Sequence, residues 1–256
     1  MIRGLARTGR SQRSSVTAAH ESRPEAHGHG HHHRDVAGGW LRPAVFGAMD
    51  GLVTNVSLIS GVGGGGASAH FVILTGLAGL AAGAFSMAAG EYVSVSSQNE
   101  LVGSEVRKEK LELENNPVAE QRELAATFRA VGVDAALARQ VAAQISANPK
   151  HALSVHVREE LGVDPQDLPS PVTAAGASLV AFSVGALIPL IPYLAGASYL
   201  WLALACAALA AIIGGGAVSR LTDRPFIRGA ARQLILGAIA AALTYGIGHL
   251  VGGAVG

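Results

Sequence analysis

The chain has 256 residues, of which 50% are hydrophobic and only 14% are charged, and its formal net charge is +1. Soluble domains carry about 25% charged residues, so this composition argues against a soluble protein. The charges are also segregated, because residues 169–219 and 233–256 contain no Asp, Glu, Lys or Arg. Uncharged apolar stretches of that length predict helices that cross a membrane. The basic residues form no patch interleaved with aromatics, so no nucleic-acid partner is expected.

Residues 1–38 are polar, rich in Arg, His and Gly, and lack apolar periodicity. A segment of this kind cannot bury enough apolar surface to fold, so we expect a disordered tail. It contains a cluster of imidazoles at His27, His29, His31, His32 and His33. Clustered histidines bind transition metals, but the composition leaves the role of this cluster open.

The apolar stretches predict an all-α integral membrane protein with five transmembrane helices. These cover about residues 41–62 and 69–98, within a region 39–98, and about 172–193, 198–219 and 229–253, within a region 169–256. The second helix is about 30 residues long, or ~45 Å, so its last turns should project beyond a ~30 Å hydrocarbon core. Arg and Lys occur in the tail, in residues 99–168 and in the 220–232 loop, but not in the other two loops. The positive-inside rule therefore predicts that the N-terminus and residues 99–168 are cytoplasmic.

Residues 99–168 separate the second and third spans and hold 12 acidic and 8 basic residues. Their apolar positions follow a helical period, and Asn115–Pro117, Gly132–Asp134 and Asn148–Pro149 carry turn and capping residues. We therefore expect a helical, cytoplasmic, metal-binding insert between the second and third transmembrane helices.

Asp50 and Glu91 are the only charged side chains between residues 43 and 99. A charge at membrane depth costs about 2.5–3.5 kcal/mol on insertion scales, so it usually marks an ion or proton pathway. Thr54 and Ser57 follow Asp50 on the same helix face and add oxygen ligands, while Met87 lies one turn before Glu91. A thioether beside a carboxylate suits a borderline transition metal. The alternatives are a capping or packing aspartate and a methionine that only fills space.

The insert also places glutamates at helical spacing. They are Glu105, Glu109 and Glu112 at i, i+4 and i+7, then Glu120 and Glu123 at i and i+3, and Glu159 and Glu160 in the last helix. Carboxylates this close repel one another unless a cation lies among them, which favours a metal site. The alternative is a solvated acidic face, neutralised by the interleaved Arg and Lys.

Two sequence runs resemble the vacuolar iron transporter family. The run Phe46–Ser57 contains the Asp50-Gly pair, and the run Ser86–Val95 contains a Met-x-x-Gly-Glu-Tyr motif that begins at Met87. With the Glu-rich insert before a three-span half, the resemblance covers about residues 40–254.

The resemblance implies a homodimer with a pathway between subunits, and export of Fe²⁺ from the cytosol in exchange for protons, with Mn²⁺ as another cargo. It implies that Asp50 and Met87 are membrane ligands. Cytoplasmic ligands would be Glu109, Glu112, Glu120, Glu123 and Glu160. Here His156-Val157 stands where some relatives have a Met pair, so His156 could supply a nitrogen ligand. The partners implied are the bilayer, divalent metal ions and protons, with no resident cofactor.

A rival interpretation is a membrane-anchored iron-binding ferroxidase or metal store. The ferritin-like signature requires Glu-x-x-His on paired helices, and no glutamate of the insert has a His three residues on. A metal sensor that does not transport is a third interpretation, which Asp50 and Met87 disfavour. No enzymatic activity is expected. The Ala- and Gly-rich, Lys-poor composition is typical of a bacterial chain and hence of a plasma membrane.

Overall fold

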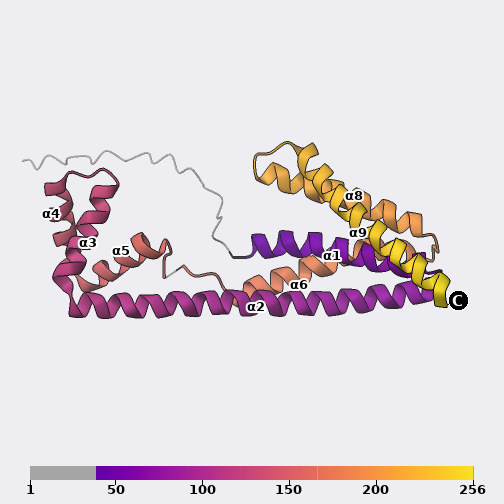
Figure 1. Ribbon diagram of the computed structural model, residues 1–256, viewed down its shortest axis with the longest axis horizontal. Helices are drawn as coiled ribbons and strands as arrows, with labels where there is room; N and C mark the ends of the chain where they lie inside the picture. The colour runs from indigo at the N-terminus through magenta and orange to yellow at the C-terminus, as the bar shows by residue number, and fades with distance from the viewer. Residues whose placement is uncertain (1–38, 166, 256) are drawn as a thin grey trace, which may run out of the picture. The chain divides into compact units, whose positions relative to one another are not determined.

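The computed structural model describes residues 39–165 and 167–255, and these form helices and turns with no strand (Figure 1). The predicted all-α fold class is therefore confirmed. The expected tail, residues 1–38 with its histidine cluster, lies outside the described residues.

The bounds of the helices follow the chain order of Figure 1. They are α1 Leu41–Gly64, α2 Ala69–Asn115, α3 Pro117–Ala130, α4 Ala135–Ser146, α5 Pro149–Leu161, α6 Pro171–Leu187, a 3-10 turn η1 Ile188–Leu190, α7 Ile191–Leu194, α8 Leu200–Leu221 and α9 Phe226–Val255. Five segments are long and apolar enough to cross a membrane: α1, α2, α6 with α7, α8 and α9. Their number agrees with the five spans predicted from the sequence.

Helix α2 is one uninterrupted helix of 47 residues. At 1.5 Å per residue it is about 70 Å long, more than twice the ~30 Å hydrocarbon core of a bilayer. The second predicted span and the first helix of the insert are therefore the same helix. Its apolar first part faces other apolar helices, and its charged last part carries Glu109 away from them.

Local capping explains why the insert breaks where it does. Asp134 accepts from the backbone N–H groups of Ala136 and Leu137 and so begins α4. These bonds stabilise the carboxylate and lower the pKa of Asp134. Asn148 caps α5 in the same way, and proline occupies the first helical position of both α3 and α5. The breaks predicted from the sequence coincide with these caps.

The apolar helices pack through small residues, with α1 in contact with α2, α6, α8 and α9. A Cβ on Gly51 would overlap the backbone of α6 at Phe182, and a Cβ on Gly248 of α9 would overlap the carbonyl oxygen of Gly61. Helix axes can approach this closely only where one partner lacks a side chain.

The Gly79-x-x-x-Gly83 motif of α2 belongs to this packing. A Cβ on Gly79 would meet the side chain of Leu58 of α1, and one on Gly83 would meet the ring of Phe182 of α6. Both contacts lie within one chain, and Phe182 is 1% exposed.

Large apolar side chains also remain exposed along the candidate spans. They include Phe71, Leu74 and Phe85 on α2, Trp201 and Ile213 on α8, and Ile235, Ile239, Leu243 and Leu250 on α9. An apolar surface of this extent is typical of helices that face lipid rather than water.

Candidate metal centre

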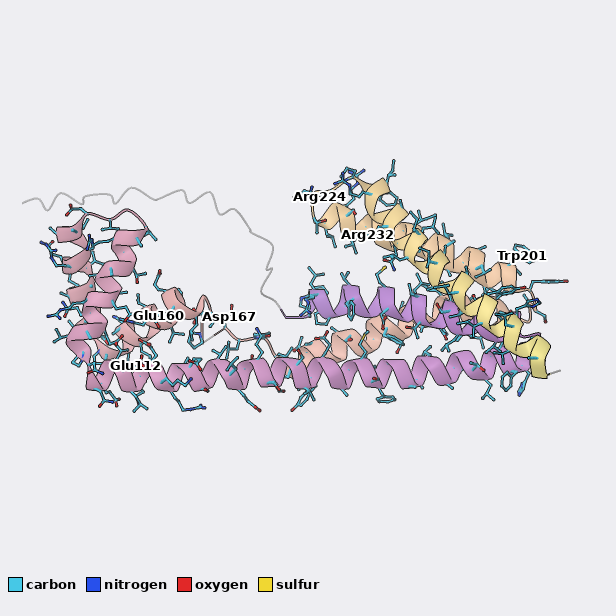
Figure 2. All side chains as sticks on the ribbon, viewed as in Figure 1. Glu112, Glu160, Asp167, Trp201, Arg224 and Arg232 are labelled. Atoms are coloured by element: carbon cyan, nitrogen blue, oxygen red, sulfur yellow. The ribbon has the colours of Figure 1, made fainter. Side chains whose placement is uncertain are left out.

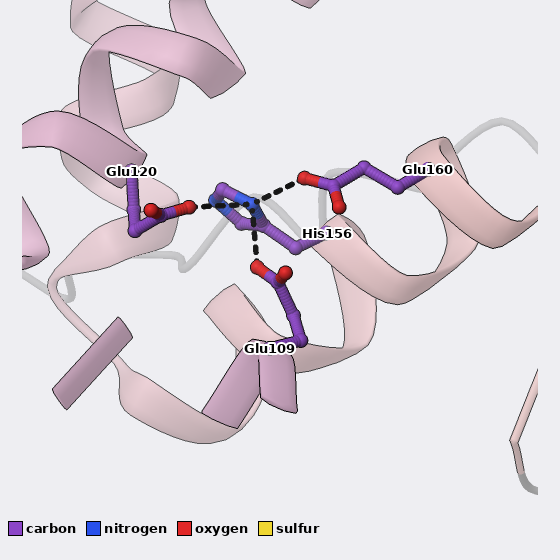
Figure 3. A group of neighbouring side chains, drawn as sticks. All are labelled: Glu109, Glu120, His156 and Glu160. Atoms are coloured by element: carbon purple, nitrogen blue, oxygen red, sulfur yellow. Dashed lines mark hydrogen bonds and ion pairs between the residues drawn. The ribbon is translucent and has the colours of Figure 1, made fainter. Parts of the chain in front are cut away.

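Helices α2, α3 and α5 bring four potential metal ligands together (Figure 3). Glu109 lies in the last turns of α2, and Glu120 lies in the first turn of α3. Asn116 and Pro117 end α2 and begin α3, so Glu120 lies only one turn beyond the bend that follows Glu109. His156 and Glu160 are one turn apart on α5, which packs against α2.

The imidazole of His156 is the centre of the group. Its Nδ1 atom lies 3.0 Å from Glu109 Oε1, 3.3 Å from Glu160 Oε1 and 3.8 Å from Glu120 Oε2. All four ligand atoms lie within 4.8 Å of one another. Ligands of a divalent transition metal lie about 2.0–2.2 Å from the ion, so neighbouring ligands are about 3 Å apart and opposite ones about 4.2 Å. The group would need to contract by less than an ångström around an ion.

Three of the four side chains are buried. The exposed fractions are 6% for Glu109, 7% for Glu120 and 1% for His156, whereas the side chain of Glu160 is 37% exposed. Among the described residues, no Lys or Arg forms an ion pair with any of these three glutamates. Buried carboxylates without a cation are costly, so the charge balance of the site favours a metal ion. Glu160 marks its open side.

The pKa values of two glutamates in the group show the cost of burying negative charges close together. Burial first, and then the charges of Glu160, Glu120 and Glu112, together raise the pKa of Glu109 from 4.5 to about 7. Burial also raises the pKa of Glu120, as does the neighbouring Glu123, while His156 partly opposes the shift. Carboxylates that hold protons near neutral pH exchange them readily for a divalent ion, because both compete for the same oxygens.

Two buried atoms of the group lack hydrogen-bond partners among the described residues: Glu109 Oε1 and His156 Nε2. With its proton on Nε2, the imidazole would present a Nδ1 lone pair to the space that the three carboxylates share. Imidazole suits iron, zinc and nickel, whereas carboxylate oxygens suit manganese and magnesium. One nitrogen with three carboxylates therefore fits a borderline divalent ion such as Fe²⁺ or Mn²⁺.

The remaining predicted ligands of the insert lie outside the group. Glu105 is bound to Lys108, with 2.6 Å between Oε1 and Nζ. Glu112 and Glu123 are exposed, and Figure 2 labels Glu112 near the end of α2. Their contribution is electrostatic, because each raises the pKa of a buried glutamate of the group.

The predicted membrane ligands are half-buried on α1 and α2. These are Asp50, Thr54 and Ser57 on α1, and Met87 and Glu91 on α2. Met87 packs against the cluster around Phe182, and Asp50 has no hydrogen bond or ion pair within the described part of the chain. No group of three His, Cys, Asp or Glu side chains is gathered in the membrane part of the described chain. The pathway role of these five residues stays a prediction.

Asn55 is a buried polar residue that sequence reasoning missed. Its Nδ2 atom donates to the carbonyl oxygen of Ala186 at 2.5 Å. Ala186 lies in the last turn of α6, where carbonyl groups have no partner within the helix. Asn55 therefore ties α1 to the end of α6, where Pro189 follows. The signal that could have found it is an amide side chain in an apolar run.

Comparison with known proteins identifies the family to which this chain belongs. The model of the VIT family matches residues 41–249, so the chain belongs to the VIT family. It is 37% identical to a vacuolar iron transporter of Acanthamoeba castellanii, over 86% of this chain and 83% of that protein. It is 33% identical to vacuolar iron transporter homolog 3 of Arabidopsis thaliana, over 83% and 84% of the two chains. Vacuolar iron transporter 2 of Oryza sativa is 32% identical, over 84% and 89%.

Family membership and the five apolar helices together define a multi-pass membrane protein. The exposed apolar side chains of α2, α8 and α9 are therefore the surface that the lipid bilayer covers.

Proposed function

We propose that this protein transports a divalent transition metal, Fe²⁺ and also Mn²⁺, out of the cytosol in exchange for protons. The observation that carries the proposal is the buried group of His156 and three glutamates, which no Lys or Arg of the described chain neutralises. The names of the relatives, vacuolar iron transporters, support iron as the cargo.

The group collects the ion before it enters the membrane. Glu160 lies at its exposed side and would contact the hydrated ion first. The buried carboxylates of Glu109 and Glu120 then replace water around the metal, and His156 adds a ligand that Mg²⁺ and Ca²⁺ accept poorly. Residues 99–168 thereby raise the concentration of the right metal near the membrane.

The transport pathway runs along α1 and α2. Asp50 supplies the charged ligand, Met87 supplies a soft ligand, and Glu91 adds a second carboxylate one turn further along α2. One chain supplies too few ligands here, so the site is completed by a second copy in a homodimer. Protons that return through the same site neutralise the carboxylates and release the metal.

The orientation rests on the distribution of arginines. The last turn of α8, the α8–α9 loop and the start of α9 together carry four of them, of which Figure 2 labels Arg224 and Arg232, and the insert holds eight basic residues. The positive-inside rule places both on the cytoplasmic side. Composition alone suggests a bacterial plasma membrane, whereas the relatives named above come from an amoeba and plants.

The test is metal flux into proteoliposomes with a simultaneous pH readout. We expect Fe²⁺ entry coupled to proton movement in the opposite direction, and loss of both in Asp50→Asn. Glu114→Gln is the matched control, because Glu114 is exposed and pairs only with Lys110, at 3.8 Å. Metal binding without flux would instead support the rival interpretation, a membrane-anchored iron store or ferroxidase, and dioxygen consumption would separate those two.

A further inference from the structure

A groove lined by three arginines lies between α3 and α4, separate from the metal centre. It has a volume of about 400 Å³ and is lined by Val118, Gln121, Arg122, Ala125, Ala126, Arg129 and Arg139. A second hollow adjoins it at the α3–α4 turn and shares Ala126 and Arg129 with it. A volume of this size accommodates a small molecule.

Helix α3 carries opposite charges on its two sides. Arg122 and Arg129 follow Glu120 by two and nine residues, which places them about 200° and 180° around the helix from it. Because Glu120 faces the metal centre, the two arginines face the opposite side. There Arg139 of α4 joins them.

The three guanidinium groups lack acidic partners. None of them forms a hydrogen bond or an ion pair within the described residues, and all three side chains are exposed. Asp134 interacts electrostatically with Arg139, but its carboxylate accepts hydrogen bonds from the backbone N–H groups of Ala136 and Leu137 in α4. The groove therefore has an uncompensated positive charge, and no acidic side chain lines it.

We propose that this groove binds a small polyanion that presents two or more carboxylate or phosphate groups. Guanidinium groups bind both kinds of group through paired hydrogen bonds, and three of them around one groove match a ligand with several anionic groups. Val118, Ala125 and Ala126 supply apolar lining against which the carbon or ester part of the ligand rests. The chemistry is shared by polycarboxylate chelators of metals and by di- or triphosphates.

The experiment is calorimetry on the full-length, metal-free protein in detergent. The probes are citrate for the carboxylate source, inorganic pyrophosphate for the phosphate source, and phosphatidylglycerol vesicles for a lipid headgroup. We expect citrate or pyrophosphate to bind, and the tighter of the two identifies the source. Arg122→Gln, Arg129→Gln and Arg139→Gln should each weaken binding about tenfold, since each removes a charge-assisted pair.

Two further variants test whether the anion binds inside the groove. Arg107→Gln removes an exposed arginine of α2 that lies outside the groove, and binding should not change. Ala126→Phe keeps every charge but fills the groove where its two hollows meet, and binding should be lost. Because no metal is present in these measurements, their outcome does not depend on whether the transport proposal is correct.

Three outcomes would overturn the proposal. The first is no binding of either small anion to the wild-type protein. The second is binding that survives in Ala126→Phe, which would reduce the effect to surface charge. The third is binding to the anionic vesicles alone, or a change of oligomeric state in the arginine variants without any anion binding, because the groove would then contact a membrane or a second copy.

Discussion

Glu109→Gln tests whether repulsion among the buried carboxylates strains the metal centre when no ion is bound. The substitution keeps the volume and hydrogen-bonding oxygen of the side chain and removes its charge. Glu109 is 6% exposed, and its closest neighbour is Nδ1 of His156. We expect the variant to be more stable than the wild type without metal, and to gain less stability when metal is added.

The magnitude follows from the pKa. Burial and the nearby glutamates raise the pKa of Glu109 from 4.5 to about 7, and at 1.36 kcal/mol per pKa unit this shift corresponds to about 3 kcal/mol. The folded state binds more protons than the unfolded state between these two values, so the stability of the wild type falls as pH rises through this window. The advantage of Glu109→Gln should therefore be absent below pH 4.5 and reach its full value above pH 7.

Hydrogen–deuterium exchange across α5, Pro149–Leu161, is the suitable assay, because it reports local opening of the helix that carries His156. At pH 8 without metal, α5 should exchange up to about 100-fold more slowly in the variant, the equivalent of about 3 kcal/mol. Metal at 100 times its Kd should protect the wild type by about 2.7 kcal/mol, and the variant much less. Glu114→Gln is the control and should match the wild type in both conditions.

Faster exchange in metal-free Glu109→Gln at pH 8 would refute this reasoning. It would show that attraction between Glu109 and His156, which lie 3.0 Å apart, outweighs repulsion among the glutamates. The site would then be a stable ion pair that needs no metal.

Three further predictions address other parts of the molecule. His156→Gln should lower the preference of the insert for Fe²⁺ over Mg²⁺ in competition calorimetry, because the only nitrogen ligand is lost; an unchanged preference would remove His156 from the ligand set. Asp50→Asn should abolish Fe²⁺ flux while the protein elutes normally from a sizing column, and wild-type flux would contradict its pathway role. Gly248→Val should lower the thermal stability in detergent by more than about 3 kcal/mol, because its side chain would overlap the carbonyl oxygen of Gly61; a stability equal to wild type would mean that α1 and α9 can separate.

The sequence was sufficient to predict the helices of the fold, because the length of each apolar stretch and the segregation of charged residues identify membrane-spanning helices directly. Five spans and the breaks at Asn116, Asp134 and Asn148 were predicted from composition and capping residues, and the structure places helix ends there. Periodicity could not show that α2 runs without a break from the apolar region into the insert. No proline separates the two parts, and the helix continues through Gly103, so the boundary drawn after Gln98 marked a change of polarity and not of structure.

The candidate site was predicted less completely, because helical spacing says which residues share a face but not which faces meet. Glu105 and Glu109 lie on the same face of α2. Glu105 forms an ion pair with Lys108, whereas Glu109 is one of the four residues of the metal centre. The partners of Glu109 come from α3 and α5, and tertiary packing alone decides that contact. The arginine groove was missed for the same reason, since Arg139 reaches it from a different helix.

The continuity of α2 also constrains how the two predicted sites can cooperate. Glu91 and Glu109 are 18 residues apart on one helix, which separates them by about 27 Å. Between them, the described residues include no further group of three His, Cys, Asp or Glu side chains that could hold an ion. Under the transport proposal, metal would leave the insert and diffuse to the membrane site, so collection and translocation would be separate events. The insert would then set the local concentration of metal and not the rate of the membrane step. Substitution of its glutamates should therefore raise the apparent KM for Fe²⁺ and leave the maximal flux unchanged, whereas a fall in maximal flux alone would show that the insert and the membrane site move as one unit.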